Sequence, residues 1–309
     1  MAGPWDRGPR PPRDAARRPP SGRPEKKWPA VASRPRGDDG APSGAGAEAD
    51  PALPPVDTAH HGARREELRL YGLNAVEAVF RRRPQAIRKL WLAEARLGVL
   101  KPLLAWCVKH RVGYRVVDTA DLDRLAGSTH HEGVVADVLR VAPLSLDAWL
   151  DGLPTHAPTL AIWLDGVGNP HNFGAILRSA AHFGAAVLLP HRSPLALSGA
   201  AARVAEGAAE AVPLVRLPPA DAAMARLRDT GFALAATVVR DGADLFAASL
   251  PPRLVYVMGA EGEGMDAGLA AACELRLSIP GSGAVESLNV AAATAVFLAQ
   301  WVAARRTRA

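Results

Sequence analysis

The sequence predicts an α/β protein in which helices cover both faces of a parallel sheet. From residue 159 onward, short apolar runs alternate regularly with segments of helical periodicity. Most of these runs are continuously apolar, which is typical of strands buried on both faces of a parallel sheet. The chain has 309 residues, of which 49% are hydrophobic, and this is enough for about two domains with packed cores.

The first part of the chain, residues 1–66, is rich in Pro, Gly, Ala and Arg and has almost no aliphatic side chains. Such a segment cannot bury enough apolar surface to offset the entropy of ordering it, so we expect a disordered tail. Its first 36 residues are strongly basic, and Trp5 and Trp28 lie among the charges. Loose gripping of RNA by charge and stacking is one interpretation, and a solvated extension without a role is the other.

A small α/β unit is expected at 67–142, where the periodicity changes between helical and extended. The pattern predicts helices over 68–84, 97–111 and 119–127, and strands over 87–93, 113–118 and 131–141. A linker is expected at 143–158.

A second α/β unit is expected at 159–309. Strands are predicted over 160–166, 185–190, 211–217, 232–239, 253–259 and 274–280. Helices are predicted over 173–184, 197–210 and 220–231, in a short stretch after Met265, and from about Leu288 to the end.

Composition excludes several classes of protein. Two cysteines imply no disulfide framework, and there is neither an apolar signal core nor a run of about 18 apolar residues, so we expect a cytoplasmic protein without a membrane span. The His pairs at 60–61 and 130–131 lack metal-ligand spacing, and no metal is expected. No dinucleotide fingerprint, Walker loop or nucleophile elbow occurs. A net charge of +6 mildly favours a polyanionic partner.

The first motif follows the first strand of the second unit. Gly166, Gly168 and Pro170 predict a turn at the carboxyl edge of the sheet, where open α/β sheets bind ligands. Asn172 comes next, and is interpreted either as a helix cap or as a site residue. Arg178 follows on the helix, as a ligand for phosphate or as an ordinary surface side chain.

The second motif is the turn after the strand at 253–259. Glu261 stands between Gly259 and Gly264, and the glycines let a ligand approach the backbone closely. The carboxylate would bind sugar hydroxyls or orient a basic group; the alternative is an exposed Glu in a strand-to-helix turn.

The third motif is a Gly/Ser/Asn loop that leads into the last helix. Gly281 and Gly283 shape the loop, Asn289 presents an amide near the helix start, and Ser287 is either a site residue or only a helix cap. One stripe of the helix is predicted to pack against the core, namely Val290, Thr294, Phe297 and Trp301.

With these three motifs in this order, the chain resembles the SpoU (TrmH-like) family of RNA ribose 2′-O-methyltransferases. The matching residues are Asn172, Arg178, Gly259, Glu261, Gly264, Ile279, Pro280, Gly283, Ser287, Leu288, Asn289 and Val290. The small unit is similar to the family's ribosomal-protein-like RNA-binding domain. The residues around the first motif are most similar to those of a poorly characterised bacterial tRNA/rRNA methyltransferase branch.

The resemblance implies a fold, a cofactor and partners. The second unit would contain a deep trefoil knot, an exception to the usual rules of chain topology. The knot loops would bind S-adenosylmethionine, and the protein would act on tRNA or rRNA as a homodimer joined through the knot region. The cofactor-binding candidates are Gly259, Ile279, Leu288, Thr237 and Gly283.

The resemblance also implies catalytic residues, which are Arg178, Asn172, Glu261, Ser287 and Asn289. A ribose 2′-hydroxyl is a poor nucleophile, and the family assigns help with its proton to Arg178. Because Arg is almost never deprotonated in proteins, an electrostatic clamp on phosphate and alkoxide is an equally good role. Two departures, Asn169 and Gly281, affect substrate choice and loop rigidity more than activity. A non-catalytic RNA-binding or ribosome-assembly protein that keeps the fold is the alternative.

Overall fold

The computed structural model describes residues 67–260, 262 and 264–306. The tail expected at 1–66, and the interpretation of that tail as an RNA grip, lie outside the described residues. Among the helices of the described part, none is long and apolar enough to cross a membrane.

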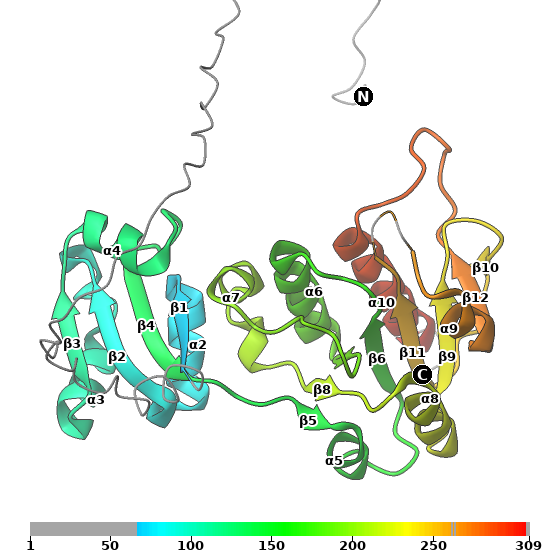
Figure 1. The fold of residues 1–309 in the computed structure, drawn as a ribbon, viewed down its shortest axis with the longest axis horizontal. Helices are drawn as coiled ribbons and strands as arrows, with labels where there is room; N and C mark the ends of the chain where they lie inside the picture. The colour runs from blue at the N-terminus through cyan, green and yellow to red at the C-terminus, as the bar shows by residue number, and fades with distance from the viewer. Residues whose placement is uncertain (1–66, 261, 263, 307–309) are drawn as a thin grey trace, which may run out of the picture. The chain divides into compact units, whose positions relative to one another are not determined.

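The first described unit is a small sheet in the order β1-β4-β2-β3 (Figure 1). Antiparallel pairing joins β4 to both β1 and β2, and β2 pairs with β3 in parallel. Its strands are β1 (Glu67–Tyr71), β2 (Ile87–Leu92), β3 (Gly113–Val116) and β4 (Val134–Leu139). Its helices are α2 (Leu73–Arg82), η1 (Pro84–Ala86), η2 (Glu94–Arg96), α3 (Lys101–His110) and α4 (Thr119–Ala126).

The prediction of one helix over 68–84 was wrong in its first part, where the chain forms β1. Leu68 and Leu70 are buried while Arg69 between them is exposed, which is the period of a strand and not of a helix. The helix α2 begins only after Gly72, whose φ of 97° is open to glycine and rarely to other residues.

The second sheet has eight strands in the described part of the chain, in the order β10-β12-β9-β11-β6-β7-β8-β5. Every pairing in it is parallel, as predicted from the apolar runs. Its strands are β5 (Leu144–Ser145), β6 (Thr159–Leu164), β7 (Ala186–Leu189), β8 (Leu214–Arg216), β9 (Ala233–Thr237), β10 (Ala243–Asp244), β11 (Arg253–Met258) and β12 (Leu275–Ser278).

The helices of this unit are α5 (Leu146–Asp151), α6 (Pro170–Phe183), α7 (Gly199–Ala205), η3 (Ala208–Glu210), α8 (Ala220–Asp229), α9 (Ala267–Ala272) and α10 (Val290–Arg306). The segment expected as a linker carries β5 and α5, and β5 pairs with β8 at the sheet edge. The single helix predicted over 197–210 is divided. Glu206 (φ 52°) and Gly207 (φ 86°) take left-handed conformations that end α7 before η3 begins.

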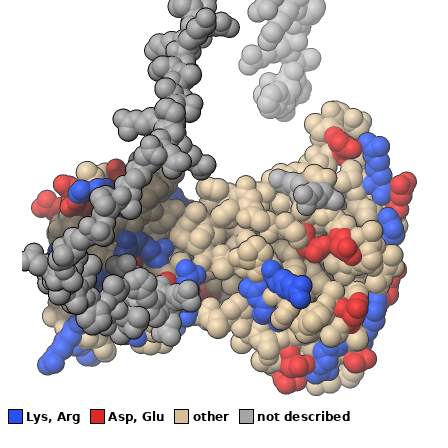
Figure 2. All heavy atoms as spheres, viewed as in Figure 1, with Lys and Arg blue, Asp and Glu red and all other residues tan. Residues whose placement is uncertain are grey.

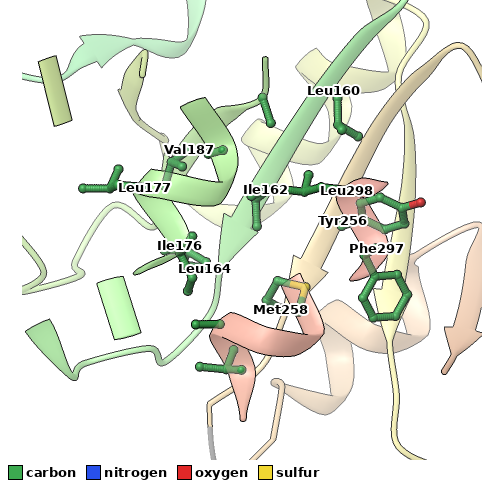
Figure 3. Close-up of a cluster of buried hydrophobic side chains, with 14 of the residues drawn as sticks. Leu160, Ile162, Leu164, Ile176, Leu177, Val187, Tyr256, Met258, Phe297 and Leu298 are labelled. Atoms are coloured by element: carbon green, nitrogen blue, oxygen red, sulfur yellow. The ribbon is translucent and has the colours of Figure 1, made fainter. Parts of the chain in front are cut away.

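The large sheet is covered on both faces, and each face has its own core. One core joins the sheet to α6 and α10, with Tyr256, Phe297 and Leu298 packed near Ile162 (Figure 3). The other core contains Trp149, Trp163 and Phe232. The predicted packing stripe of α10 is confirmed, because all four of its side chains are buried. Each large buried side chain contributes about 1.5–3 kcal/mol to stability.

Charged residues of both signs share the surface. Figure 2 shows Lys and Arg side chains next to Asp and Glu side chains along the right-hand margin of the face that it draws. Along this margin the surface is therefore not uniformly positive, although the whole chain has a net positive charge.

Candidate active site

The three sequence motifs meet at the carboxyl edge of the large sheet. A hollow of about 210 Å³ lies there, lined by the turn after β6, the start of α6, the residue after Gly259 and the start of α10. The lining residues are Gly166, Val167, Gly168, Asn169, Asn172, Ala260 and Val290. This is where the strand order of an open parallel sheet places ligands.

The first motif is held by a cap on α6. Asn169 accepts hydrogen bonds at its Oδ1 from the backbone amides of His171 (2.8 Å) and Asn172 (3.4 Å). The interpretation of Asn172 as the helix cap was therefore wrong: Pro170 opens the helix, and the cap precedes a proline at the first helical position. The side-chain oxygen of Asn172 instead accepts a hydrogen bond from Asn289.

The third motif contributes a second cap, and again not the expected one. Asn289 Oδ1 accepts from the backbone amides of Ala291 (2.9 Å) and Ala292 (3.3 Å) at the start of α10. Ser287 lies two residues before Asn289, and α10 begins at Val290, so the capping role considered for Ser287 was wrong. Asn289 Nδ2 donates to Asn172 Oδ1 at 3.0 Å. One amide thus joins the first and third motifs.

The second motif is a tight turn after β11. The backbones of Ala260 and Gly264 exchange hydrogen bonds of 2.8 and 3.1 Å. A Cβ on Gly259 would lie 2.6 Å from the carbonyl carbon of Gly264 and 2.7 Å from the nitrogen of Met265, so only glycine fits. Glu261, the proposed polar group of this motif, lies outside the described residues.

Sequence reasoning missed one residue that ties the first two motifs together. Asp165 directly follows β6, and its Oδ2 accepts from the backbone amide of Asp266 at 2.9 Å. Its own backbone amide donates to the carbonyl of Met258 at 2.8 Å. An acidic residue immediately after a buried strand was the available signal.

The cofactor-binding candidates divide into two groups. Thr237, Gly259 and Ile279 lie at the ends of β9, β11 and β12, which are neighbours in the sheet. Thr237 Oγ1 donates to the carbonyl of Val257 at 2.9 Å, so its hydroxyl bridges β9 and β11. Gly283 and Leu288 lie in the exposed loop before α10.

The loop before α10 lies beside the loop after β9. Arg240 and Glu286 form an ion pair of 3.3 Å between these two loops. The side chains of Val285 and Leu288 are 71% and 48% exposed. Apolar surface is therefore exposed beside the strand ends.

Arg178 stands apart from the paired asparagines. Its side chain is exposed on α6, and it makes no hydrogen bond or ion pair with any residue that the structure describes. Its electrostatic neighbour is Glu206, whose pKa is lowered chiefly by a hydrogen bond from Asn74, further by Arg203, and also by the charge of Arg178. The structure thus brings Asn172 and Asn289 together and leaves the Arg178 guanidinium open to a ligand.

Two family models match this chain. The SpoU rRNA Methylase family matches residues 159–299, and the model for RNA 2′-O ribose methyltransferase substrate binding matches residues 69–143. The chain is 36% identical over 242 residues to the 23S rRNA (guanosine-2′-O-)-methyltransferase RlmB of Shewanella oneidensis, covering 77% of this chain and 98% of the relative.

The chain belongs to the SpoU rRNA methylase family.

A second relative belongs to the kind of protein that the residues around the first motif indicated, a poorly characterised tRNA/rRNA methyltransferase. The SpoU chain described here is 36% identical over 238 residues to the uncharacterized tRNA/rRNA methyltransferase YfiF of Escherichia coli O157:H7, with 77% of this chain and 68% of that protein covered. The family resemblance stated from the motifs is thereby confirmed.

Solved methyltransferase structures have the same fold. An AdoMet-bound rRNA methyltransferase from Sinorhizobium meliloti matches with a TM-score of 0.65 at 22% identity, over 81% of this chain and 90% of that one. The SpoU methyltransferase AviRb from Streptomyces viridochromogenes matches with a TM-score of 0.66 at 22% identity, over 79% and 93%. Among the residues described for this SpoU protein, no three His, Cys, Asp or Glu side chains gather as metal ligands would.

Proposed function

We propose that this SpoU protein is an S-adenosylmethionine-dependent methyltransferase acting on a ribose 2′-hydroxyl of tRNA or rRNA in the cytoplasm. The observation that carries the proposal is the hydrogen bond from Asn289 to Asn172. This hydrogen bond joins the first and third motifs, whose asparagines are 117 residues apart in sequence. Both motifs lie at the carboxyl edge of the large sheet, beside the glycine-rich turn that follows β11. The named activities of the relatives support the same reaction.

The residues at the strand ends fit S-adenosylmethionine. A nucleoside needs backbone groups for its polar edges and an apolar surface for its ring, and pockets for such ligands are mostly apolar with few polar groups. The backbones at Thr237, Gly259 and Ile279 supply the polar backbone groups, and the exposed side chain of Leu288 supplies the apolar surface for the ring. When bound, S-adenosylmethionine supplies an electrophilic methyl group.

The protein's own contribution is to position the ribose and to stabilise charge. Arg178 binds an RNA phosphate and stabilises the developing 2′-alkoxide as a clamp, because its guanidinium stays protonated. The hydroxyl proton passes to solvent water as the methyl group is transferred. Asn172 and Asn289 hold the ribose through the amide groups that their mutual hydrogen bond orients. Glu261 and Ser287 are assigned to the same site by the family motif. Alignment of the hydroxyl with the methyl donor supplies the rest of the rate.

The test replaces Arg178 by Ala. Methyl transfer should fall by about 10²-fold or more, as when a charge-stabilising donor is removed, while calorimetric binding of S-adenosylmethionine stays at the wild-type level. Arg226→Ala, which removes a surface Arg paired with Asp147, is the matched control and should leave both unchanged. Absence of cofactor binding by the wild type would overturn the proposal, and RNA binding without any transfer would favour a non-catalytic role.

We also propose that the chain is knotted and dimeric. Two features support the knot. β12 lies between β9 and β10 although it follows both of them in sequence, and a Cβ on Gly242 would lie 2.8 Å from Leu277 C and Ser278 N, so the segment that leads into β10 packs tightly against β12.

A groove of about 590 Å³ between the ends of α6 and α10 supports the dimer, because its lining is largely apolar. The lining residues are Ala181, His182, Phe183, Gly184, Ala299, Val302, Ala303 and Arg306. Sedimentation equilibrium should give twice the chain mass for the wild type and a monomer for Ala299→Glu. A monomeric wild type would overturn the dimer.

A further inference from the structure

Among the contacts that join the substrate-binding domain, residues 69–143, to the segment formed by α7 and η3, two are ion pairs between an arginine and a glutamate. In the first, Arg83 donates from Nε and Nη2 to the two carboxylate oxygens of Glu210, at 2.6 and 2.7 Å. Its Nη1 donates to the carbonyl of Leu139 at 2.6 Å. The two charged side chains are only 14% and 8% exposed. A two-pronged pair of this kind, largely removed from water, fixes orientation as well as distance, unlike an exposed ion pair.

The second contact is centred on Arg203 of α7. Its Nη2 donates to Glu132 Oε1 at 2.7 Å and its Nε donates to the carbonyl of His130 at 3.0 Å. Glu132 is itself held, because its other oxygen accepts from the backbone amide of Leu73 at 2.8 Å. The Arg203 side chain passes directly over Gly72, where any side chain would collide with it.

The segment formed by α7 and η3 is in turn packed tightly against the helix that carries the site. A Cβ on Gly174 of α6 would lie 2.5 Å from the carbonyl oxygen of Ala201 and 2.7 Å from Cβ of Val204. The same helix carries Asn172 and Arg178. An unbroken series of close contacts therefore runs from the substrate-binding domain through α7 to α6, the helix that carries Arg178.

Resting on the function proposed above, we propose that the Arg83–Glu210 and Arg203–Glu132 contacts fix the distance between the substrate-binding domain and Arg178, and so determine which ribose of a bound RNA is methylated. Domains of one chain move relative to each other unless their interface holds them. A domain held in this way presents one ribose at the reactive end of α6. Because a misplacement of 1 Å costs about 10²-fold in rate, neighbouring riboses react far more slowly. Arg83 and Arg203 are positioning residues in this account.

The experiment compares Arg83→Gln, Arg203→Gln and the double variant with the wild type. Arg226→Gln is the matched control, since it breaks an ion pair within the larger domain. Nitroxide labels on Val108→Cys and Val239→Cys, both at exposed positions, report the distance between the domains. Cys107 is buried and Cys273 is replaced by Ala, so that neither takes up label. The second readout is the map of 2′-O-methyl sites on the RNA substrate.

The wild type and the control should give one narrow distance distribution and one methylated ribose. The double variant should broaden the distribution and spread methylation over neighbouring riboses, while S-adenosylmethionine binding is unchanged. If the variants at Arg83 fail to fold, Arg203→Gln alone tests the proposal, because its partner Glu132 is more exposed than Glu210. It should broaden the distance distribution and spread methylation to a smaller extent than the double variant. A broad distribution in the wild type, or a double variant that keeps both the narrow distribution and the single site, overturns the proposal. A wild type that methylates no RNA refutes the proposed function instead. In that case the distance distributions of the wild type and the double variant still show whether the two ion pairs hold the domains together.

Discussion

At the scale of single residues, the side-chain amide of Asn289 serves two structural purposes. Its oxygen caps α10, and its nitrogen donates to Asn172 at the start of α6. A cap satisfies backbone amides that a helix start leaves without partners. The position of α10 and the geometry of the site therefore depend on one group.

Replacing Asn289 by Ala should destabilise the protein more than replacing Asn172 by Ala. The first change removes a cap, worth about 1 kcal/mol, together with the inter-helix hydrogen bond, worth about 1 kcal/mol. The second change removes the inter-helix hydrogen bond but leaves the cap of α10 in place. Urea denaturation of both variants measures the difference, and equal losses of the free energy of unfolding would contradict the capping role.

Glu206 should make stability depend on pH in the acid range. Its folded-state pKa is lowered from the usual value of 4.5, chiefly by the hydrogen bond from Asn74. A lowered carboxyl pKa contributes stability that is present above the unfolded pKa and is lost as pH falls through the folded pKa. Wild type should therefore be more stable than Glu206→Gln at pH 7, and the gap should close below about pH 4.5. A gap that stays constant down to pH 3 in chemical denaturation would contradict this.

The residues that the sequence could not place correctly are the two caps. Asn169, Asn172, Ser287 and Asn289 all have side chains that suit a cap, so residue type does not choose among them. The choice is made by where each helix begins, at Pro170 and at Val290, and this depends on packing against the sheet.

At the scale of secondary structure, α6 is confined between α7 and α10, and Gly174 is the position where α7 comes closest. Gly in a helix interior normally costs stability relative to Ala, so a change to Ala usually stabilises. Here the added Cβ would lie 2.5 Å from the carbonyl oxygen of Ala201. Packing should therefore outweigh helix propensity.

Gly174→Ala should lower the free energy of unfolding by about 1–3 kcal/mol, the usual cost of overpacking. Gly152→Ala after α5 is a control, since its backbone is in the right-handed helical region and the nearest atom to an added Cβ lies at 3.5 Å, an ordinary contact distance. Thermal unfolding of both variants measures the effect. A more stable Gly174→Ala protein would show that α7 is not held against α6.

Elements with long apolar runs were predictable, and short or interrupted ones were not. The runs that became β6, β9 and β11 carry enough buried residues to define a strand. β5 and β10 have two residues each, so their pairing is decided by neighbouring strands. The break in 197–210 depends on Glu206 taking a left-handed conformation, which is uncommon for a residue other than glycine.

At the scale of the whole molecule, the order of the three motifs along the chain indicated the SpoU family. They are far apart in the sequence, and the parallel sheet brings its strand ends to one edge, so motifs after β6 and β11 and before α10 had to lie close together. The contacts of the substrate-binding domain with α7 and η3 could not be predicted, because ion pairs between distant residues such as Arg83 and Glu210 leave no periodic signal.

The central claim is that the protein methylates a ribose 2′-hydroxyl in cellular RNA. Mapping 2′-O-methyl sites in tRNA and rRNA from cells with and without the gene tests it most directly. At least one site should disappear on deletion and return with the wild-type gene but not with Arg178→Ala. An unchanged map in the deletion strain would contradict it.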